Sequence, residues 1–207
     1  MADVTDLCND ALGQIGATRI TAIDDNSHNA NVCSTFYSTL RDGFLSLTRW
    51  SFAETRIELA QVPIPPLFGF TYSYQLPTDL LVIREFNGNN ANPTIPLIFG
   101  DAWFGVAYGV NYFKIEGDKL FTNDSSAFIV YTARIENPDR WGALFYQALT
   151  FLLAAKLASA LTKDDKKAQA KLQDGLNMIH MASGVDGQQG SVVPMPVNDL
   201  IWGRFNA

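Results

Sequence analysis

The chain has 207 residues, of which 47% are hydrophobic, 12% aromatic and 17% charged, and its formal net charge is −6. This composition excludes a disordered chain, and the length suffices for a core without a metal or a disulfide. The negative charge argues against a surface that wraps nucleic acid, because such binding depends on Lys and Arg that neutralise phosphates. An acidic surface is still compatible with a pore through which DNA slides.

Cellular location is indicated by two features. The start MADVTDLCND lacks the basic region and apolar run of a secretory signal, and Cys8 and Cys33 are too few for a disulfide framework. We therefore expect assembly in a reducing cytoplasm. Residues 141–161 are long enough to cross a bilayer, but Lys156 would be costly there, so we expect a buried helix at the centre of a helical layer.

Two helices are predicted at the N-terminal end. Apolar residues spaced i, i+3, i+4 and i+7 over residues 4–15 predict a short helix, with Asp3 as N-cap and Gly16 as its stop. Ser27 is the expected N-cap of a longer helix that runs to about Trp50. The buried side of this helix is predicted to carry Ala30, Cys33, Phe36 or Tyr37, Leu40, Phe44 and Leu47.

A β region follows the prolines at positions 63, 65 and 66, which forbid a regular helix. Segments rich in β-forming residues between about 68 and 133 predict four to six strands, two of them around a Gly117-Asp118 turn. The expected structure is an antiparallel sheet or a small barrel.

The helical period returns at Asn137-Pro138, a common start signal, and predicts a buried helix to about Leu161. A last helix is predicted to end at Gly184, and its buried face carries Ala168, Leu172, Leu176, Ile179 and Ala182. Each pair of helices is too small for its own core. We therefore expect both pairs to pack together, with the sheet inserted between them in sequence.

The predicted fold class is α+β, with four segments: N-terminal helices of a bundle (1–62), an antiparallel β region (63–136), C-terminal helices of the bundle (137–184) and an extended C-terminal arm (185–207). The arm has no period, yet it carries seven large apolar residues that are interface candidates: Val192, Val193, Met195, Leu200, Ile201, Trp202 and Phe205. Disordered tails rarely hold so much apolar surface, so we expect the arm to dock on a neighbouring subunit or on its own body.

Four sequence segments stand out by their order and spacing along the chain: LCNDALGQIGATRITAIDD, NANVCSTFYSTLRDGFLSLTRWSFAETRIELA, YSYQLPTDLLVIREF and VYTARIENPDRWGALFYQALTFLLAAKLASALTKD. The most specific parts are a Trp-x-Phe-Ala that begins at Trp50 and a Leu-Pro-x-Asp that begins at Leu76. In these phrases, which span most of residues 5–165, the chain resembles the tail tubular protein A, or head-to-tail adaptor (connector), family of short-tailed bacteriophages. Departures appear mainly between Asn87 and Val110.

The resemblance implies a structural virion protein that forms a homo-oligomeric ring, dodecameric in well-known members, between the portal and the tail nozzle. Its partners would be further copies of itself, the portal protein, the tail nozzle protein and, in some relatives, tail fibres. DNA would pass through the lumen during ejection without sequence-specific binding. The implied location is the neck of the virion, after assembly in the host cytoplasm, without membrane insertion.

No enzyme activity is expected. The sequence has no HExxH, GxSxG, P-loop or GxGxxG with a suitable helix, so no catalytic, cofactor-binding or metal residue is predicted. The alternative function is a carbohydrate-binding tail module, with an aromatic face formed by Phe70, Tyr72, Tyr74, Tyr108, Tyr112 and Phe113.

Two charged groups and one aromatic group remain. The basic group Lys163, Lys166, Lys167 and Lys171 is a candidate contact with the portal or DNA, but we favour a solvated helix face, because aspartates are interleaved with it. For Arg134, Glu136, Asp139 and Arg140 we favour a solvated edge over an ion-pair network or an interface. Trp50, Phe52 and Ala53 are interpreted as core residues.

Overall fold

The structure, a computed structural model, describes residues 3–88 and 113–189. Its helices are α1 (Val4–Ile15), α2 (His28–Leu47), η1 (Ser51–Ala53), η2 (Pro138–Arg140), α3 (Ala143–Leu157), η3 (Ala158–Thr162, a π-helix) and α4 (Asp165–Gly187). Its strands are β1 (Glu54–Glu58), β2 (Tyr72–Gln75), β3 (Leu80–Asn87), β4 (Phe113–Glu116), β5 (Lys119–Thr122) and β6 (Phe128–Ala133).

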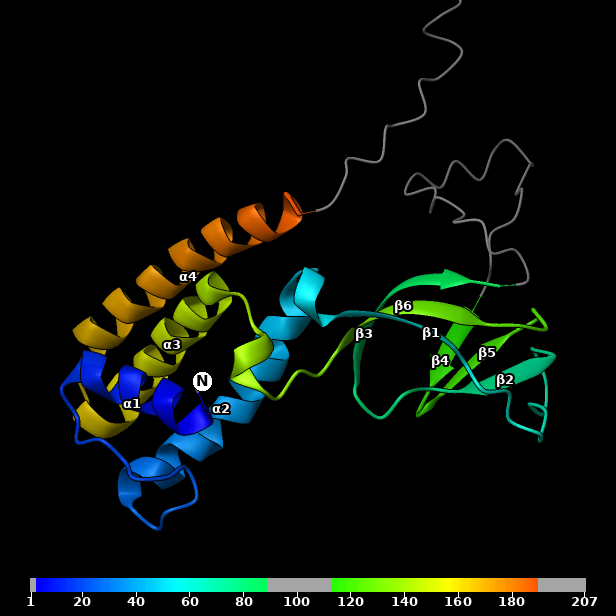
Figure 1. Ribbon diagram of the computed structural model, residues 1–207. Helices are drawn as coiled ribbons and strands as arrows, with labels where there is room; N and C mark the ends of the chain where they lie inside the picture. Colours follow the sequence, from blue (N-terminus) through cyan, green and yellow to red (C-terminus); the bar gives the residue numbers. More distant parts are fainter. Residues whose placement is uncertain (1–2, 89–112, 190–207) are drawn as a thin grey trace, which may run out of the picture.

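The predicted α+β class is confirmed. Helices from both ends of the chain form one helical layer, in which α1, α2 and α4 all pack against the central α3. Figure 1 shows the β region beside this layer, joined to it by the stretch between α2 and β1 and by the stretch between β6 and α3. The sheet region is therefore inserted between the two helical parts, as expected.

The β region consists of two three-stranded antiparallel sheets, with strand orders β1-β6-β3 and β2-β5-β4. The Gly117-Asp118 turn is confirmed: it joins β4 to β5, and Gly117 takes a positive φ of 62° that suits glycine. The expected start at residue 63 is too late, because Glu54–Glu58 pairs with β6 along its whole length. The β region begins at β1.

Helix starts agree with the capping residues predicted for two helices. The Asp3 carboxylate accepts from the Asp6 N–H at 2.8 Å, and Ser27 Oγ accepts from the Ala30 N–H at 3.2 Å. The start of α4 is also capped, by the side chain of Asp164. Gly16 ends α1 in the left-handed region, with φ 76°. These signals are local, so the sequence alone defines them.

Three other helix ends were predicted wrongly. Helix α2 stops at Leu47, and α4 continues past Gly184 to Gly187. Asn137-Pro138 begins only the single turn η2, because Trp141 is extended and its indole N–H donates to the Ile135 carbonyl at 3.0 Å. Helix α3 therefore starts later, at Ala143.

The core of the helical layer is an aromatic cluster around Phe145, whose ring lies 4.4 Å from Phe44, 5.0 Å from Trp50, 5.1 Å from Phe52 and 5.2 Å from Trp141 between centroids. The Trp50 indole N–H donates to the Phe44 carbonyl at 3.1 Å, so its polar atom is satisfied inside the core. Trp50 and Ala53 are buried and Phe52 is half-buried, which confirms the core interpretation.

The predicted buried faces of α2 and α4 are partly wrong: Leu47, Leu172 and Leu176 are exposed. On α4 the reason is close packing at Gly175, where an added Cβ would lie 2.9 Å from the Leu152 side chain. This contact turns Gly175, Ile179 and Ala182 inward and leaves Leu172 and Leu176 on the flank of the helix.

The aromatic cluster yields a test of stability. Phe145→Ala is expected to lower the free energy of unfolding by about 3–5 kcal/mol, because a large cavity would open among four aromatic rings. Phe68→Ala is the matched control, since Phe68 is exposed, and should change it by less than about 0.5 kcal/mol. Urea unfolding followed by circular dichroism measures both, and equal losses would contradict the central place of Phe145.

Candidate functional site

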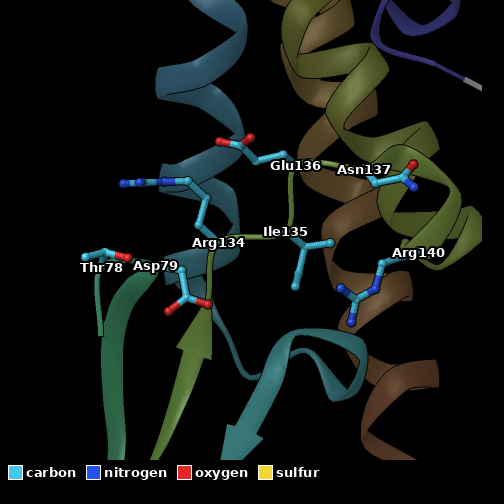
Figure 2. Close-up of a pocket in the computed structure, with 7 residues that line it drawn as sticks. All are labelled: Thr78, Asp79, Arg134, Ile135, Glu136, Asn137 and Arg140. Atoms are coloured by element: carbon cyan, nitrogen blue, oxygen red, sulfur yellow. The ribbon is translucent and has the colours of Figure 1, made fainter. Parts of the chain in front are cut away.

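A pocket of about 530 Å³ opens where β6 leads towards η2, between the sheet and the helices. Figure 2 shows its lining residues, Thr78, Asp79, Arg134, Ile135, Glu136, Asn137 and Arg140. We call this place the charged junction, because four of the seven carry ionisable side chains. It connects the β region to the helical layer.

Asp42 of α2 pairs with two arginines, Arg134 of the charged junction and Arg41 of α2. Its carboxylate accepts from Arg41 Nε at 2.8 Å and from Arg134 Nε at 2.9 Å. Glu136 lies 3.7 Å from the Arg41 guanidinium. Arg41 is only 7% exposed, so its charge needs this partner. The interpretation as a solvated edge holds for Glu136, whose side chain is 73% exposed, but it is wrong for Arg134, which is paired with Asp42 of α2.

Asp79 closes the other side of the junction. Its carbonyl accepts from the Arg134 N–H at 2.7 Å, and its carboxylate accepts from the Tyr131 hydroxyl at 3.1 Å. Burial first, and then the charge of Asp79, raises the pKa of Tyr131 to about 12. These bonds hold the end of β6 against the turn before β3.

The chemistry of the charged junction is structural pairing of charges. None of its seven lining residues is His, Cys or Ser, and Arg134 is already paired with Asp42. Asp139 and Arg140 are exposed, and Asp139 contributes a backbone N–H that donates to Asn137 Oδ1 at 3.0 Å. The network joins strand and helix rather than aligning a nucleophile with a base.

The four lysines of the predicted basic group have different surroundings in the structure. Lys167 Nζ donates to the Ile15 carbonyl at 3.2 Å, which satisfies the C-terminal end of α1. Lys171 pairs with Asp174 at 3.2 Å and lies over the Phe151 ring, 5.1 Å from its centroid. Lys163 lies in the left-handed turn before α4 with φ 52°, and Lys166 is exposed in the first turn of α4. Two of the four lysines thus have local structural roles.

Cys8 and Cys33 are fully buried, as predicted for core positions. The hydrogen bond with Cys33 and then burial raise the pKa of the Cys8 thiol, which keeps it protonated and unreactive. Among residues 3–88 and 113–189, no three His, Cys, Asp or Glu side chains gather closely enough to hold a metal ion.

The six aromatic residues proposed for a carbohydrate-binding face do not form one exposed surface among the described residues. Tyr74 is buried and donates to the Asp124 carbonyl at 2.9 Å, while Phe113 packs against Phe86 at 4.9 Å between centroids. Phe70 is half-buried and lies 6.3 Å from Phe121. Tyr72 is half-buried on β2, and Tyr108 and Tyr112 lie outside the described residues. A buried Tyr74 offers no ring to a carbohydrate.

The seven interface candidates of the arm also lie outside the described residues: Val192, Val193, Met195, Leu200, Ile201, Trp202 and Phe205. Two features of the described part were missed by sequence reasoning. One is an exposed apolar loop at residues 62–70, and the other is a groove over α3. The three prolines signalled a boundary, but not that Leu67 and Phe68 would face solvent.

Known proteins do not identify the chain: no family model matches it, and no curated protein matches it significantly. Ala143–Thr162 is the one stretch of the described residues that is long and apolar enough to cross a membrane, and half of its most apolar window is buried inside the protein. Length and composition fit a core helix equally well.

The ion-pair network yields a second prediction. Asp42→Asn should lower the free energy of unfolding by about 1–3 kcal/mol, because Arg41 stays buried without its carboxylate. Glu136→Gln is the matched control: its side chain is 73% exposed and 3.7 Å from Arg41, so the loss should be under about 0.5 kcal/mol. Thermal unfolding at neutral pH measures the two, and a larger loss in the control would reject the bridging role of Asp42.

Tyr131 yields a prediction about alkaline pH. Its pKa is about 12 in the folded chain and about 10 in an unfolded one, so the folded state favours the neutral phenol. Its contribution to stability is present below pH 10 and is lost as the pH rises towards 12. Tyr131→Phe should therefore flatten the fall of unfolding free energy with pH in this window. An unchanged slope would show that Tyr131 ionises as easily folded as unfolded.

Proposed function

We propose that the chain is a structural ring subunit, the adaptor that joins the portal of a short-tailed phage head to the tail nozzle and surrounds the DNA ejection channel. The ordered phrases around Trp50, Leu76 and Trp141 support this proposal by their resemblance to the adaptor family. The observation that carries it is an apolar surface in the loop of residues 62–70, at the far end of the β region from the helices.

This loop exposes three large apolar side chains: Ile64 is 77% exposed, Leu67 99% and Phe68 86%. Exposed apolar groups gathered on one loop are typical of an association surface. A monomer gains nothing from presenting them to water, whereas a neighbour that covers them gains apolar burial.

The first residues of the loop are also tied to β2. Val62 N–H donates to the Ser73 carbonyl at 2.8 Å, and Ser73 Oγ donates to the Ile64 carbonyl at 3.1 Å. Three prolines restrict its backbone, and Gly69 takes a positive φ of 85°. A loop whose backbone is restricted by prolines loses less conformational entropy when it binds, which favours association.

A ring also requires a second, different surface on each subunit, because neighbours around a ring meet head to tail. The helical layer offers Leu172 and Leu176, one turn apart on the exposed flank of α4. This surface and the loop of residues 62–70 lie on different parts of the elongated chain (Figure 1). The pair suits a head-to-tail contact, and the net charge of −6 suits a channel that does not retain DNA.

The test combines Leu67→Ser with Phe68→Ser and measures oligomeric state by mass photometry, with and without the cognate portal. We expect the unaltered chain to form rings. The double variant should form them only at a protein concentration at least about tenfold higher, because the loss of a central contact costs about 1.4 kcal/mol or more. Ile115→Ser, on β4 of the same sheet region, is the control and should assemble normally. An unaltered chain that stays monomeric under both conditions would contradict the proposal.

A further inference from the structure

The helical layer contains a groove of about 790 Å³ between α1 and α4, with α3 as its floor. Its walls include Trp141 before α3, Tyr146 and Phe151 of α3, and Met178 of α4. We call it the helical groove. Helix α3 belongs to the most apolar helical stretch of the described chain, and half of that window is unburied. The groove leaves part of α3 uncovered, where Tyr146 and Phe151 lie beside the polar side chains of Gln147 and Thr150.

An apolar strip continues from the helical groove along α4. Met178, Met181 and Val185 are spaced i, i+3 and i+7, which places them on one side of the helix. Met181 and Val185 are exposed, and Val185 lies two residues before the end of α4 at Gly187. The uncovered surface thus runs from the groove to the C-terminal end of α4, shortly before residue 190.

The groove also contains an unsatisfied acceptor. Gln14 lines it, and its side-chain oxygen is buried with no donor among the described residues. Tyr146 is not that donor, because its hydroxyl donates to Asp10 at 2.9 Å. Buried acceptors are almost always paired in native proteins. This oxygen has no exposed surface, however, so it does not select the occupant of the groove.

We infer that residues 190–207 fold back along α4 of the same copy and occupy the helical groove. These eighteen residues can span up to about 60 Å when extended. Met178 precedes residue 189 by eleven positions, or about 17 Å along a helix, so the groove is well within reach. The apolar strip begins where this segment is attached, which favours its own copy over a neighbour.

The composition of residues 190–207 matches part of the helical groove. The groove has an apolar and aromatic part, formed by Trp141, Tyr146, Phe151 and Met178, and a polar part, formed by Asp10, Gln14, Gln147 and Thr150. The first part suits the large apolar residues of the segment: Val192, Val193, Met195, Leu200, Ile201, Trp202 and Phe205. The inference concerns a single subunit and holds whether or not the chain forms a ring.

The test uses the full chain with Trp202→Cys carrying a benzophenone, which replaces one aromatic group by another. The native thiols are fully buried, so the reagent attaches to the introduced cysteine. Irradiation should give a cross-link within one chain, and mass spectrometry should locate it on peptides that contain Tyr146, Phe151 or Met178. Phe205→Cys with the same probe repeats the test if the first variant fails to fold.

Ser38→Cys on exposed α2, which does not line the groove, is the matched control and should give no cross-link to these peptides. A cross-link to the groove of another copy, seen at twice the chain mass, would overturn the inference and place the arm on a neighbour. A cross-link outside the groove would also overturn it. If the chain forms rings but gives no cross-link within one chain, only this inference is contradicted. If the chain gives that cross-link but stays monomeric, only the proposed function is contradicted.

Discussion

Packing of aromatic rings around Phe145 is the interaction on which the rest of the structure depends. Phe44 comes from α2, Trp50 and Phe52 from the stretch before β1, and Trp141 from the stretch before α3. The cluster therefore ties together segments about one hundred residues apart. Because both connections to the β region begin at these rings, the same contacts that form the helical core also position the sheets.

The charged junction fixes the orientation of the β region against the helical layer. Apolar packing alone would tolerate some rotation of the β region, whereas the hydrogen bond from Arg134, at the end of β6, to Asp42 of α2 favours one geometry. Asp79 holds the opposite side through Tyr131 and the Arg134 backbone. The site is thus best understood as a joint between the two regions, and the surfaces available for partners lie elsewhere, in the loop of residues 62–70 and at Leu172 and Leu176 of α4.

Much of the fold could be predicted where the signal is local or periodic. Capping at Asp3 and Ser27, the Gly117-Asp118 turn and the burial of Cys8 and Cys33 depend on a few neighbouring residues. The failures are tertiary. Leu172 and Leu176 follow the helical period, but the close approach of Gly175 to Leu152 chooses a different face. Arg41 is polar by type, and only its pairing with Asp42 makes its burial tolerable.

The candidate site was less accessible to sequence reasoning than the fold. Arg134 and Glu136 were recognised as a charged cluster, but their partners on α2 are about ninety residues away in sequence. The helical groove depends on how three helices diverge, which no single helix period encodes. The proposed adaptor function is supported by the resemblance of four sequence segments and by exposed apolar surfaces, which bear on association rather than on chemistry.

The central claim, that this chain works by assembling with itself and with a portal, is tested most directly by electron microscopy of the purified chain mixed with its portal. The account predicts a ring of this chain stacked coaxially on the portal ring, with the loops of residues 62–70 at contacts between subunits. Portal rings that remain bare beside dispersed single chains would contradict it.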